Sequence, residues 1–485
     1  MNKRLKTSHP LLATVKLNMT LQPIKMLCII PLLFMLTACD VDSTDETGAP
    51  VVDGGNTNID IDGDGVNNEF DAFPNDASET TDTDGDGTGD NADIDDNDNG
   101  LIEISSLEQL DWIRNDLTGS SLNDGLTAIT SGCTIGCIGY ELTQTLDFDT
   151  NSDGVMDVND TYFDYDDDGS NNGWLPIGIN DSTFSAIFEG NDYEIRNLYI
   201  NRSVNDIETG GVYIGLFGYL EGTSVNPAIR NLGLTGELMN VTGYRYIGGL
   251  IGYNENISIT ASYTTGAVSG VGSYVGGLVG KTRYANITSS YSTGAVTGGA
   301  NYTGGLIGQA YYSSILASYT TASVSAQYST GGLIGETFSS SITASYATGV
   351  GGGGIDGGLV GRLLDSSITA SYFAGVVDGI DGGLAGLARN SSITASYWAT
   401  DISNQSEAIG SNEEESTVDA IGATLEQLQC PITENNTNCL TDETLYSGWN
   451  TIDHDGDDTT DVIAPWIFGD SDTLPTLDIT LTIEQ

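Results

Sequence analysis

The sequence predicts an all-β fold, a right-handed parallel β-helix (β-solenoid) preceded by an extended acidic stalk. A repeat of 25–28 residues occupies the second half of the chain, which is rich in Gly, Ser, Thr and Tyr and has almost no helical pattern. Residues 40–100 contain 20 acidic residues, no basic ones and too little apolar material for a core. These observations divide the chain into a stalk and a stack of repeats.

The repeat has one half of fixed length and one half of variable length. Gly-Gly-Leu begins at Gly248, Gly276, Gly304, Gly331, Gly357 and Gly382, and Ser-Tyr begins at Ser262, Ser290, Ser318, Ser345, Ser371 and Ser396. The Gly-to-Ser offset is always 14 residues, whereas the offset from Ser to the next Gly falls from 14 to 11. A unit this short cannot bury its apolar face alone, so we expect parallel coils that bond to one another and turn right-handed.

Alternation within a unit predicts which side chains share a face. Ile259, Ala261 and Tyr263 are expected on one face of a strand, with Thr260 and Ser262 on the other. The residue after each Gly-Gly-Leu-x-Gly is expected in one stacked column, which contains Tyr253, Lys281, Gln309, Glu336, Arg362 and Leu387. Glu336 and Arg362 would then be neighbours, as a surface ion pair worth less than about 1 kcal/mol.

Residues 1–38 have the pattern of an export signal. Five basic residues and no acidic ones accompany an apolar run at 26–35, which leads into Leu36-Thr37-Ala38-Cys39. This ending resembles the bacterial lipobox, which implies a lipidated Cys39 that anchors the exported protein in a membrane of the cell envelope. We expect the outer membrane or cell surface. Inner-membrane retention, and an ordinary signal peptide with an incidental cysteine, are the alternatives.

Four segments follow the signal. They are the acidic stalk at 39–100, an N-terminal capping region at 101–175, the repeat β-helix at 176–400 and a C-terminal cap at 401–485. Within the capping region, Ser106 is the first residue of a capping box that leads into a short amphipathic helix. Trp449 and Trp466 in the last segment are expected to help cover the open sheet edge.

The net charge limits the partners of the chain. Removing residues 1–38 takes five of the 14 basic residues, which leaves nine against 68 acidic residues and a formal net charge of −59. Such a field repels nucleic acid and attracts divalent cations. We therefore exclude nucleic acid as a partner and expect metal binding.

Calcium is the expected metal, because twelve-residue loops carry oxygen ligands at positions 1, 3, 5, 9 and 12 with Gly at position 6. Three segments fit, with ligands at Asp60, Asp62, Asp64, Asn68 and Asp71, at Asp82, Asp84, Asp86, Asp90 and Asp93, and at Asp149, Asn151, Asp153, Asp157 and Asp160. A weaker fourth loop runs from Asp95 to Glu103. The first two loops resemble thrombospondin type-3 repeats, and the third resembles an EF-hand loop, which implies Ca²⁺ that stiffens the chain. A solvated acidic linker is the alternative.

The repeats resemble a known motif. The units Gly-Gly-Leu-Ile-Gly and Ile-Thr-Ala-Ser-Tyr-Thr-Thr-Gly-Ala-Val, seen from Gly248 to Val268, are similar to the GLUG motif of bacterial surface proteins and adhesins. The resemblance covers roughly residues 176–400. It implies a β-solenoid at the cell surface and a role in adhesion, and it leaves the ligand, a glycan or a protein, undefined.

The cysteines and histidines indicate which covalent and catalytic chemistry the chain can support. Cys133 with Cys137, and Cys430 with Cys439, are expected to form two local disulfides in an exported chain, with a zinc site of four thiolates as the weaker alternative. His454 is the one histidine after the signal, which excludes a His-Glu-x-x-His zinc peptidase. We assign no catalytic residues. A polysaccharide lyase or glycoside hydrolase, and a spacer without a ligand, are the alternatives to an adhesin.

A binding face is expected in the fixed-length turn after Gly-Gly-Leu-x-Gly. That region combines aromatic and charged residues, which are Lys281, Tyr284, Tyr311, Tyr312, Glu336, Phe338 and Arg362. Exposed aromatic rings beside charges suit a carbohydrate or protein partner. The alternative is that these rings fold back over the corner as packing.

Overall fold

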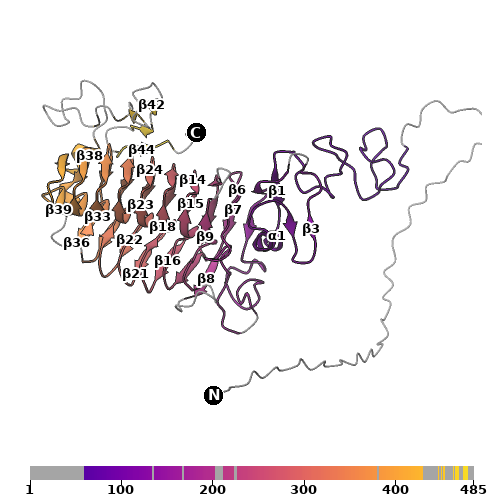
Figure 1. Ribbon diagram of the computed structural model, residues 1–485, viewed down its shortest axis with the longest axis horizontal. Coiled ribbons are helices and arrows are strands. Elements are labelled where there is room, and N and C mark those ends of the chain that lie inside the picture. The colour runs from indigo at the N-terminus through magenta and orange to yellow at the C-terminus, as the bar shows by residue number, and fades with distance from the viewer. Residues whose placement is uncertain are drawn as a thin grey trace, which may run out of the picture. The chain divides into compact units, whose positions relative to one another are not determined.

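The computed structural model describes residues 59–133, 136–166, 169–202, 211–222, 227–354, 356–378 and 382–429, with short stretches between 446 and 478. Over these residues the chain is nearly all β, with short helices at α1 (Leu107–Trp112), α2 (Thr400–Ser403), α3 (Leu425–Leu428) and the 3-10 helix η1 (Ile113–Asn115). Successive coils stack side by side through parallel strands (Figure 1). The predicted parallel β-solenoid is confirmed, and its right-handed sense stays a prediction.

Four parallel sheets run along the stack, each formed by equivalent strands of successive coils. The first has 19 strands, β1 (Leu101–Ile104), β4 (Gly139–Leu142), β5 (Leu146–Asp147), β6 (Ile187–Glu189), β7 (Glu194–Arg196), β10 (Ala228–Arg230), β11 (Gly233–Thr235), β14 (Ser258–Thr260), β15 (Tyr263–Thr264), β19 (Asn286–Thr288), β20 (Tyr291–Ser292), β24 (Ser314–Leu316), β25 (Tyr319–Thr320), β29 (Ser341–Thr343), β30 (Tyr346–Ala347), β34 (Ser367–Thr369), β35 (Tyr372–Phe373), β38 (Ser392–Ala399) and β40 (Thr417–Ala423). The second has seven strands, β8 (Tyr199–Arg202), β12 (Asn240–Gly243), β16 (Ala267–Gly270), β21 (Val296–Gly298), β26 (Val324–Ser325), β31 (Val350–Gly352) and β36 (Val376–Asp378).

The other two parallel sheets complete the coil. The third has eight strands, β9 (Phe217–Glu221), β13 (Ile251–Glu255), β18 (Val279–Arg283), β23 (Ile307–Tyr311), β28 (Ile334–Phe338), β33 (Val360–Leu364), β37 (Ala385–Arg389) and β39 (Ile409–Glu413). The fourth has four strands, β17 (Val275–Gly276), β22 (Thr303–Gly304), β27 (Thr330–Gly331) and β32 (Asp356–Gly357). Antiparallel pairs outside the stack are β2 (Leu122–Asn123) with β3 (Ala128–Ile129), β41 (Ile452–Asp453) with β42 (Val462–Ile463), and β43 (Trp466–Ile467) with β44 (Thr476–Leu477).

Parallel pairing continues outside the predicted 176–400 in both directions. β1 and β4 pair with each other and β4 with β6, so the stack includes part of the expected N-terminal capping region. β39 and β40 pair with β37 and β38, so a last coil lies within the expected C-terminal cap. The outer coils form the same parallel pairs with different residues, so the sequence motif is not recognisable in them.

The predicted alternation breaks at a corner. Ala261 has φ 47°, a left-handed conformation that reverses the side on which the following residues point. Ile259 and Ser262 are therefore both buried, and Tyr263 is only half-buried. The expectation that Tyr263 shares a face with Ile259 is wrong. The isoleucines that stack in the column of Ile259 stay inside, with Ile342 and Ile368 at 0% exposure.

The repeated Gly-Gly-Leu has a packing reason. The leucines at the third position are fully buried in every coil, which are Leu250, Leu278, Leu306, Leu333, Leu359 and Leu384. A Cβ at Gly277 would lie 2.3 Å from the carbonyl oxygen of Gly305 in the next coil. Only glycine permits this approach of two backbones, which explains why the motif recurs in these six coils.

Aromatic residues of the C-terminal segment cover the side of the last coils. Trp449 and Trp466 lie 5.4 Å from the ring of Tyr397 and 5.7 Å from that of Tyr372, respectively. The indole N–H of Trp449 donates to the carbonyl of Ala395 at 2.8 Å. Both tryptophans thus pack against tyrosines of the first sheet, and not over the open sheet edge as expected.

Candidate calcium loops and binding face

Five acidic loops each contain the same type of hydrogen bond. The carboxylate of the first Asp accepts from the N–H of a glycine five residues later, at 3.1 Å for Asp60–Gly65, 3.2 Å for Asp82–Gly87, 2.8 Å for Asp95–Gly100, 3.0 Å for Asp149–Gly154 and 2.8 Å for Asp164–Gly169. All five glycines have positive φ, from 79° to 101°. One loop geometry is therefore built five times.

The loop that begins at Asp164 was not predicted from the sequence. Its spacing, with Asp at 164, 166 and 168 before Gly169, was visible. Leu175 stands at position 12, where a carboxylate is required, so this segment does not match a complete ligand set. The structure shows that the turn itself depends on the first Asp and the glycine.

The first two loops bring carboxylate oxygens together. Ligand atoms of Asp60, Asp62 and Asp64 lie within 4.8 Å of one another, and so do those of Asp82, Asp84 and Asp86. In these two loops, buried carboxylate oxygens without a hydrogen-bond partner occur on Asp62, Asp64, Asp71 and Asp84. An orphaned buried carboxylate oxygen is costly, and a cation with oxygen ligands satisfies it. These residues therefore fit Ca²⁺.

Some predicted ligands at positions 9 and 12 bond to the loop instead. Asn68 accepts from the N–H of Ile61 at 2.9 Å. Asp90 accepts from the N–H and hydroxyl of Thr83, both at 2.8 Å. Asp160 accepts from the N–H groups of Thr150 and Asp157. These side chains close their loops, and their direct contact with a metal stays a prediction.

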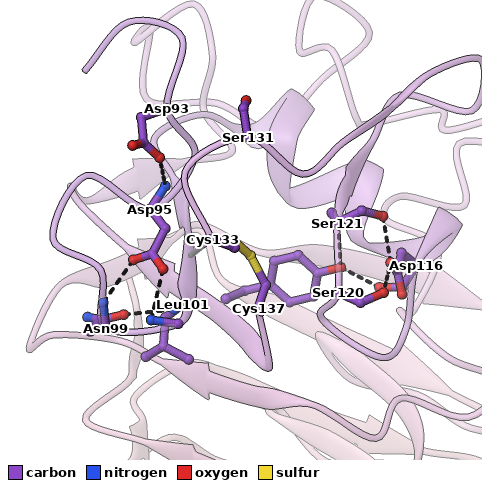
Figure 2. Close-up of a disulfide and its surroundings, with 12 residues drawn as sticks. Asp93, Asp95, Asn99, Leu101, Asp116, Ser120, Ser121, Ser131, Cys133 and Cys137 are labelled. Carbon is purple, nitrogen blue, oxygen red and sulfur yellow. Dashed lines mark hydrogen bonds between the residues drawn. A yellow bond between two sulfur atoms is a disulfide. The ribbon is translucent and has the colours of Figure 1, made fainter. Parts of the chain in front are cut away.

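The weaker fourth loop lies beside a disulfide (Figure 2). Asp95 is fully buried and accepts from the N–H groups of Asn99 and Gly100. Cys133 and Cys137 are bonded to each other, so these two sulfurs are not thiolate ligands of a zinc ion. Cys39, Cys430 and Cys439 lie outside the described residues.

Two further carboxyl groups of this loop are held close together. Burial, and then repulsion by Asp90, raises the pKa of Asp96 to about 6. Burial, and then repulsion by Asp96, raises the pKa of Glu103 to about 7. One oxygen of Asp96 is buried without a hydrogen-bond partner. The ligand spacing in the sequence offers no reason to single out Asp96.

The column after Gly-Gly-Leu-x-Gly has the predicted register. Each member pairs with the next across successive coils, from Tyr253 through Lys281, Gln309, Glu336 and Arg362 to Leu387. Lys281, Tyr311 and Phe338 lie on strands of the third sheet and not in a turn, because bonding between coils extends each strand up to a one-residue corner. Tyr284 and Tyr312 occupy that corner, with φ 52° and 48°.

The aromatic residues of the predicted face contact one another. Tyr284 stacks on Tyr312 with ring centroids 5.2 Å apart, and Tyr311 stacks on Phe338 at 4.6 Å. Tyr284 and Tyr312 are nevertheless 46% and 43% exposed. The rings pack along the axis of the stack and still present a surface, so each of the two expectations for them describes part of the arrangement.

The ion pair in the column is more buried than expected. Glu336 binds Arg362 at 2.8 Å and accepts from the amide of Gln309 at 2.6 Å. Gln309 and Glu336 are each only 6% exposed. Burial raises the pKa of Glu336, which Gln309 and Arg362 oppose. The expected surface pair is therefore a largely desolvated network, for which the small energies of surface pairs do not apply.

Two hollows adjoin this face. One of about 790 Å³ is lined mainly by serines at the corner between the third and first sheets, with Tyr312, Asp365 and Asn390. The other, of about 330 Å³, lies between the third sheet and the variable turn, and its lining includes Tyr302, Tyr328 and Arg362. The larger hollow follows serines that recur in register from coil to coil, whereas no motif position marks the smaller one.

Comparison with known proteins identifies the repeats. The family model described as "The GLUG motif" matches residues 243–269 and 271–297, so the chain carries GLUG motifs, as the resemblance implied. A "Putative Gly-rich membrane protein" of Evansella cellulosilytica is 40% identical over 92 residues, which are 18% of this chain and 10% of that protein. The match thus spans a tenth of the relative's length.

Solved structures with a similar arrangement include a "putative immunoglobulin A1 protease from Bacteroides ovatus". It aligns with a TM-score of 0.42 and 18% identity over 78% of this chain and 92% of that chain. An "IgA1 Protease" aligns with a TM-score of 0.28 and 15% identity over 66% of this chain and 21% of that chain.

Within the described residues of the present chain, no helix is long and apolar enough to cross a membrane.

Proposed function

We propose that this GLUG-repeat solenoid is a calcium-binding lipoprotein of the bacterial cell surface that attaches to a surface ligand. The observation that carries the proposal is the face of Lys281, Tyr284, Tyr311, Tyr312, Glu336, Phe338 and Arg362, where exposed stacked rings adjoin charged groups and two hollows. Such a combination is typical of carbohydrate and protein recognition. The ligand is a glycan or a protein.

Calcium supports the fold of the acidic zone in this proposal. The orphaned oxygens of Asp62, Asp64, Asp71 and Asp84 would bind the ion, and the glycine-anchored turns hold these side chains in place. Ca²⁺ supplies charge neutralisation and cross-linking of the loops, and it takes part in no reaction. Calorimetric titration of the apoprotein tests it, with Asp62→Asn and Asp84→Asn each expected to remove one binding event.

The lipid anchor is supported by the signal sequence that precedes Cys39 and by the similarity to a protein described as a membrane protein. Replacing Cys39 with Ser should move the protein from the membrane fraction to the periplasm or medium and abolish metabolic labelling with a palmitate analogue. Protease accessibility on intact cells distinguishes the cell surface from the inner membrane. A Cys39→Ser protein that stays with the membranes contradicts the anchor.

Attachment is tested at three rings of the face. We expect Tyr311→Ala, Tyr312→Ala and Phe338→Ala to reduce attachment to cells and glycan surfaces without lowering the melting temperature. Tyr193, which is 38% exposed on another part of the stack, provides the matched control as Tyr193→Ala. Attachment that survives all three substitutions rejects the face. Release of soluble oligosaccharides during the assay would make the protein a polysaccharide-degrading enzyme instead, and binding to nothing would leave a spacer.

A further inference from the structure

Basic residues are concentrated on one sheet of a strongly acidic chain. Of the nine basic residues that follow the signal, Lys281, Arg283, Arg362 and Arg389 lie on strands of the third sheet. Arg245 lies next to them, over the rings of Tyr246 and Tyr274. Salt bridges within 4.0 Å occupy Arg283, Arg362 and Arg389. Among the described strands of this sheet, Lys281 is the cation left for an anionic partner.

Lys281 is placed to meet such a partner. Its ammonium lies 5.7 Å from the ring centroid of Tyr253, 5.3 Å from that of Tyr274 and 5.8 Å from that of Tyr311. Among the described residues, Lys281 makes no ion pair within 4.0 Å, whereas Arg283 pairs with Glu255 at 3.1 Å. Burial lowers the pKa of Lys281. A partly desolvated ammonium without a counter-ion binds an anion more strongly than a surface lysine does.

Further along the same column, polar atoms are buried without partners. Gln309 is 6% exposed, and its Oε1 has no hydrogen-bond partner. The Nε of Arg362 is likewise buried without one, although its Nη1 binds Glu336. Arg362 lines the hollow of about 330 Å³ with Tyr302 and Tyr328. A ligand in this hollow would meet the guanidinium of Arg362, whose side chain is 29% exposed.

We infer that the strip formed by Tyr253, Lys281, Gln309, Glu336 and Arg362 binds an acidic glycan, with uronic-acid carboxylates at Lys281 and Arg362. The inference rests on the proposed function and names its ligand. Lys281 and Arg362 are three coils apart, roughly 14 Å, so an oligosaccharide lying along the stack reaches both. The ring of Tyr302 lines the hollow beside Arg362, where it can contact a sugar ring.

A glycan fits the strip better than an acidic peptide does. Extended peptides bind sheets by pairing their backbone with an open edge. The column lies inside the third sheet, where each strand from β13 to β37 already bonds to a neighbour on both sides. Recognition here depends on side chains alone, as sugar binding does.

The test uses the calcium-loaded full-length protein and hyaluronan oligosaccharides as the probe. Their methyl esters keep the sugars and remove the charge, dextran supplies a neutral glycan, dextran sulfate an anion without a carboxylate, and poly-L-glutamate an acidic peptide. We expect binding of hyaluronan that weakens with salt, at least about tenfold weaker binding by Lys281→Gln, and loss of binding for the methyl esters. Gln309 occupies the same column, so Lys281→Gln should fold; Arg196→Gln, on β7 of the first sheet, is the matched control.

The outcomes separate this inference from the proposed function. Equal binding of the methyl esters, Lys281-dependent binding of dextran sulfate or poly-L-glutamate in preference to hyaluronan, or no binding of hyaluronan overturns the inference. If attachment to cells depends on Tyr311, Tyr312 and Phe338 but is unchanged by Lys281→Gln, the proposed function stands without the acidic glycan. If attachment depends on neither set, both fail.

Discussion

The serine of each Ser-Tyr pair shows how a single residue type secures the stack. The hydroxyl of Ser345 accepts from the N–H of Ser318 in the preceding coil at 3.2 Å and donates to the carbonyl of Thr343 at 2.8 Å. Equivalent bonds link Ser262, Ser290, Ser318, Ser345, Ser371 and Ser396. All six serines are fully buried. They replace backbone bonds that the left-handed corner before them interrupts.

Replacing Ser345 with Ala should therefore destabilise the protein. It leaves the buried N–H of Ser318 without an acceptor, which costs about 1–3 kcal/mol of unfolding free energy. Ser325→Ala, at an exposed position of β26, is the control and should be nearly neutral. Chemical denaturation measures both. Equal stability of the two variants would mean that the serine column contributes nothing to the stack.

At the scale of elements, the acidic loop is the unit that recurs along the chain. Gly87 has φ 93°, and a Cβ added to it would have no atom within 4 Å, so glycine is needed there for conformation and not for space. Gly87→Ala should weaken Ca²⁺ binding at the second loop by about tenfold, because a left-handed alanine costs about 1–2 kcal/mol. Gly352→Ala, outside the loops, is the control. Titration calorimetry measures the difference, and unchanged affinity would show that this turn does not set the site.

Elements that repeat could be predicted from the sequence, and elements that do not repeat could not. The spacing of Gly-Gly-Leu determines the register of the column from Tyr253 to Leu387, because parallel coils bring equivalent positions together. The corner at Ala261 has no residue signature, since alanine is not a typical left-handed residue, so the faces of Ser262 and Tyr263 were assigned wrongly. The hollow at Arg362 depends on a variable turn, whose path the motif does not determine.

At the scale of the whole molecule, bound cations and hydrogen bonds stabilise different parts of the chain. Fourteen aspartates lie between Asp53 and Asp98, and their repulsion is relieved only by cations. Chelation should therefore expand a fragment of residues 40–100 in small-angle scattering. It should leave the melting temperature of the solenoid nearly unchanged, because backbone bonds and buried leucines hold the coils. Identical fragment dimensions with and without chelator, or a large loss of solenoid stability, would contradict this separation.

The last coil ends in strands that could pair with another molecule. Within the described residues, β39 pairs only with β37 and β40 only with β38, so one side of each strand is open. Glu413 lies on β39 and Asp419 on β40, and charges on an open edge oppose pairing between chains. Glu413→Thr combined with Asp419→Thr should therefore promote concentration-dependent self-association in sedimentation velocity, whereas Glu108→Thr, on α1, should not. A double variant that sediments like the unmodified protein at every concentration would show that something other than these charges protects the edge.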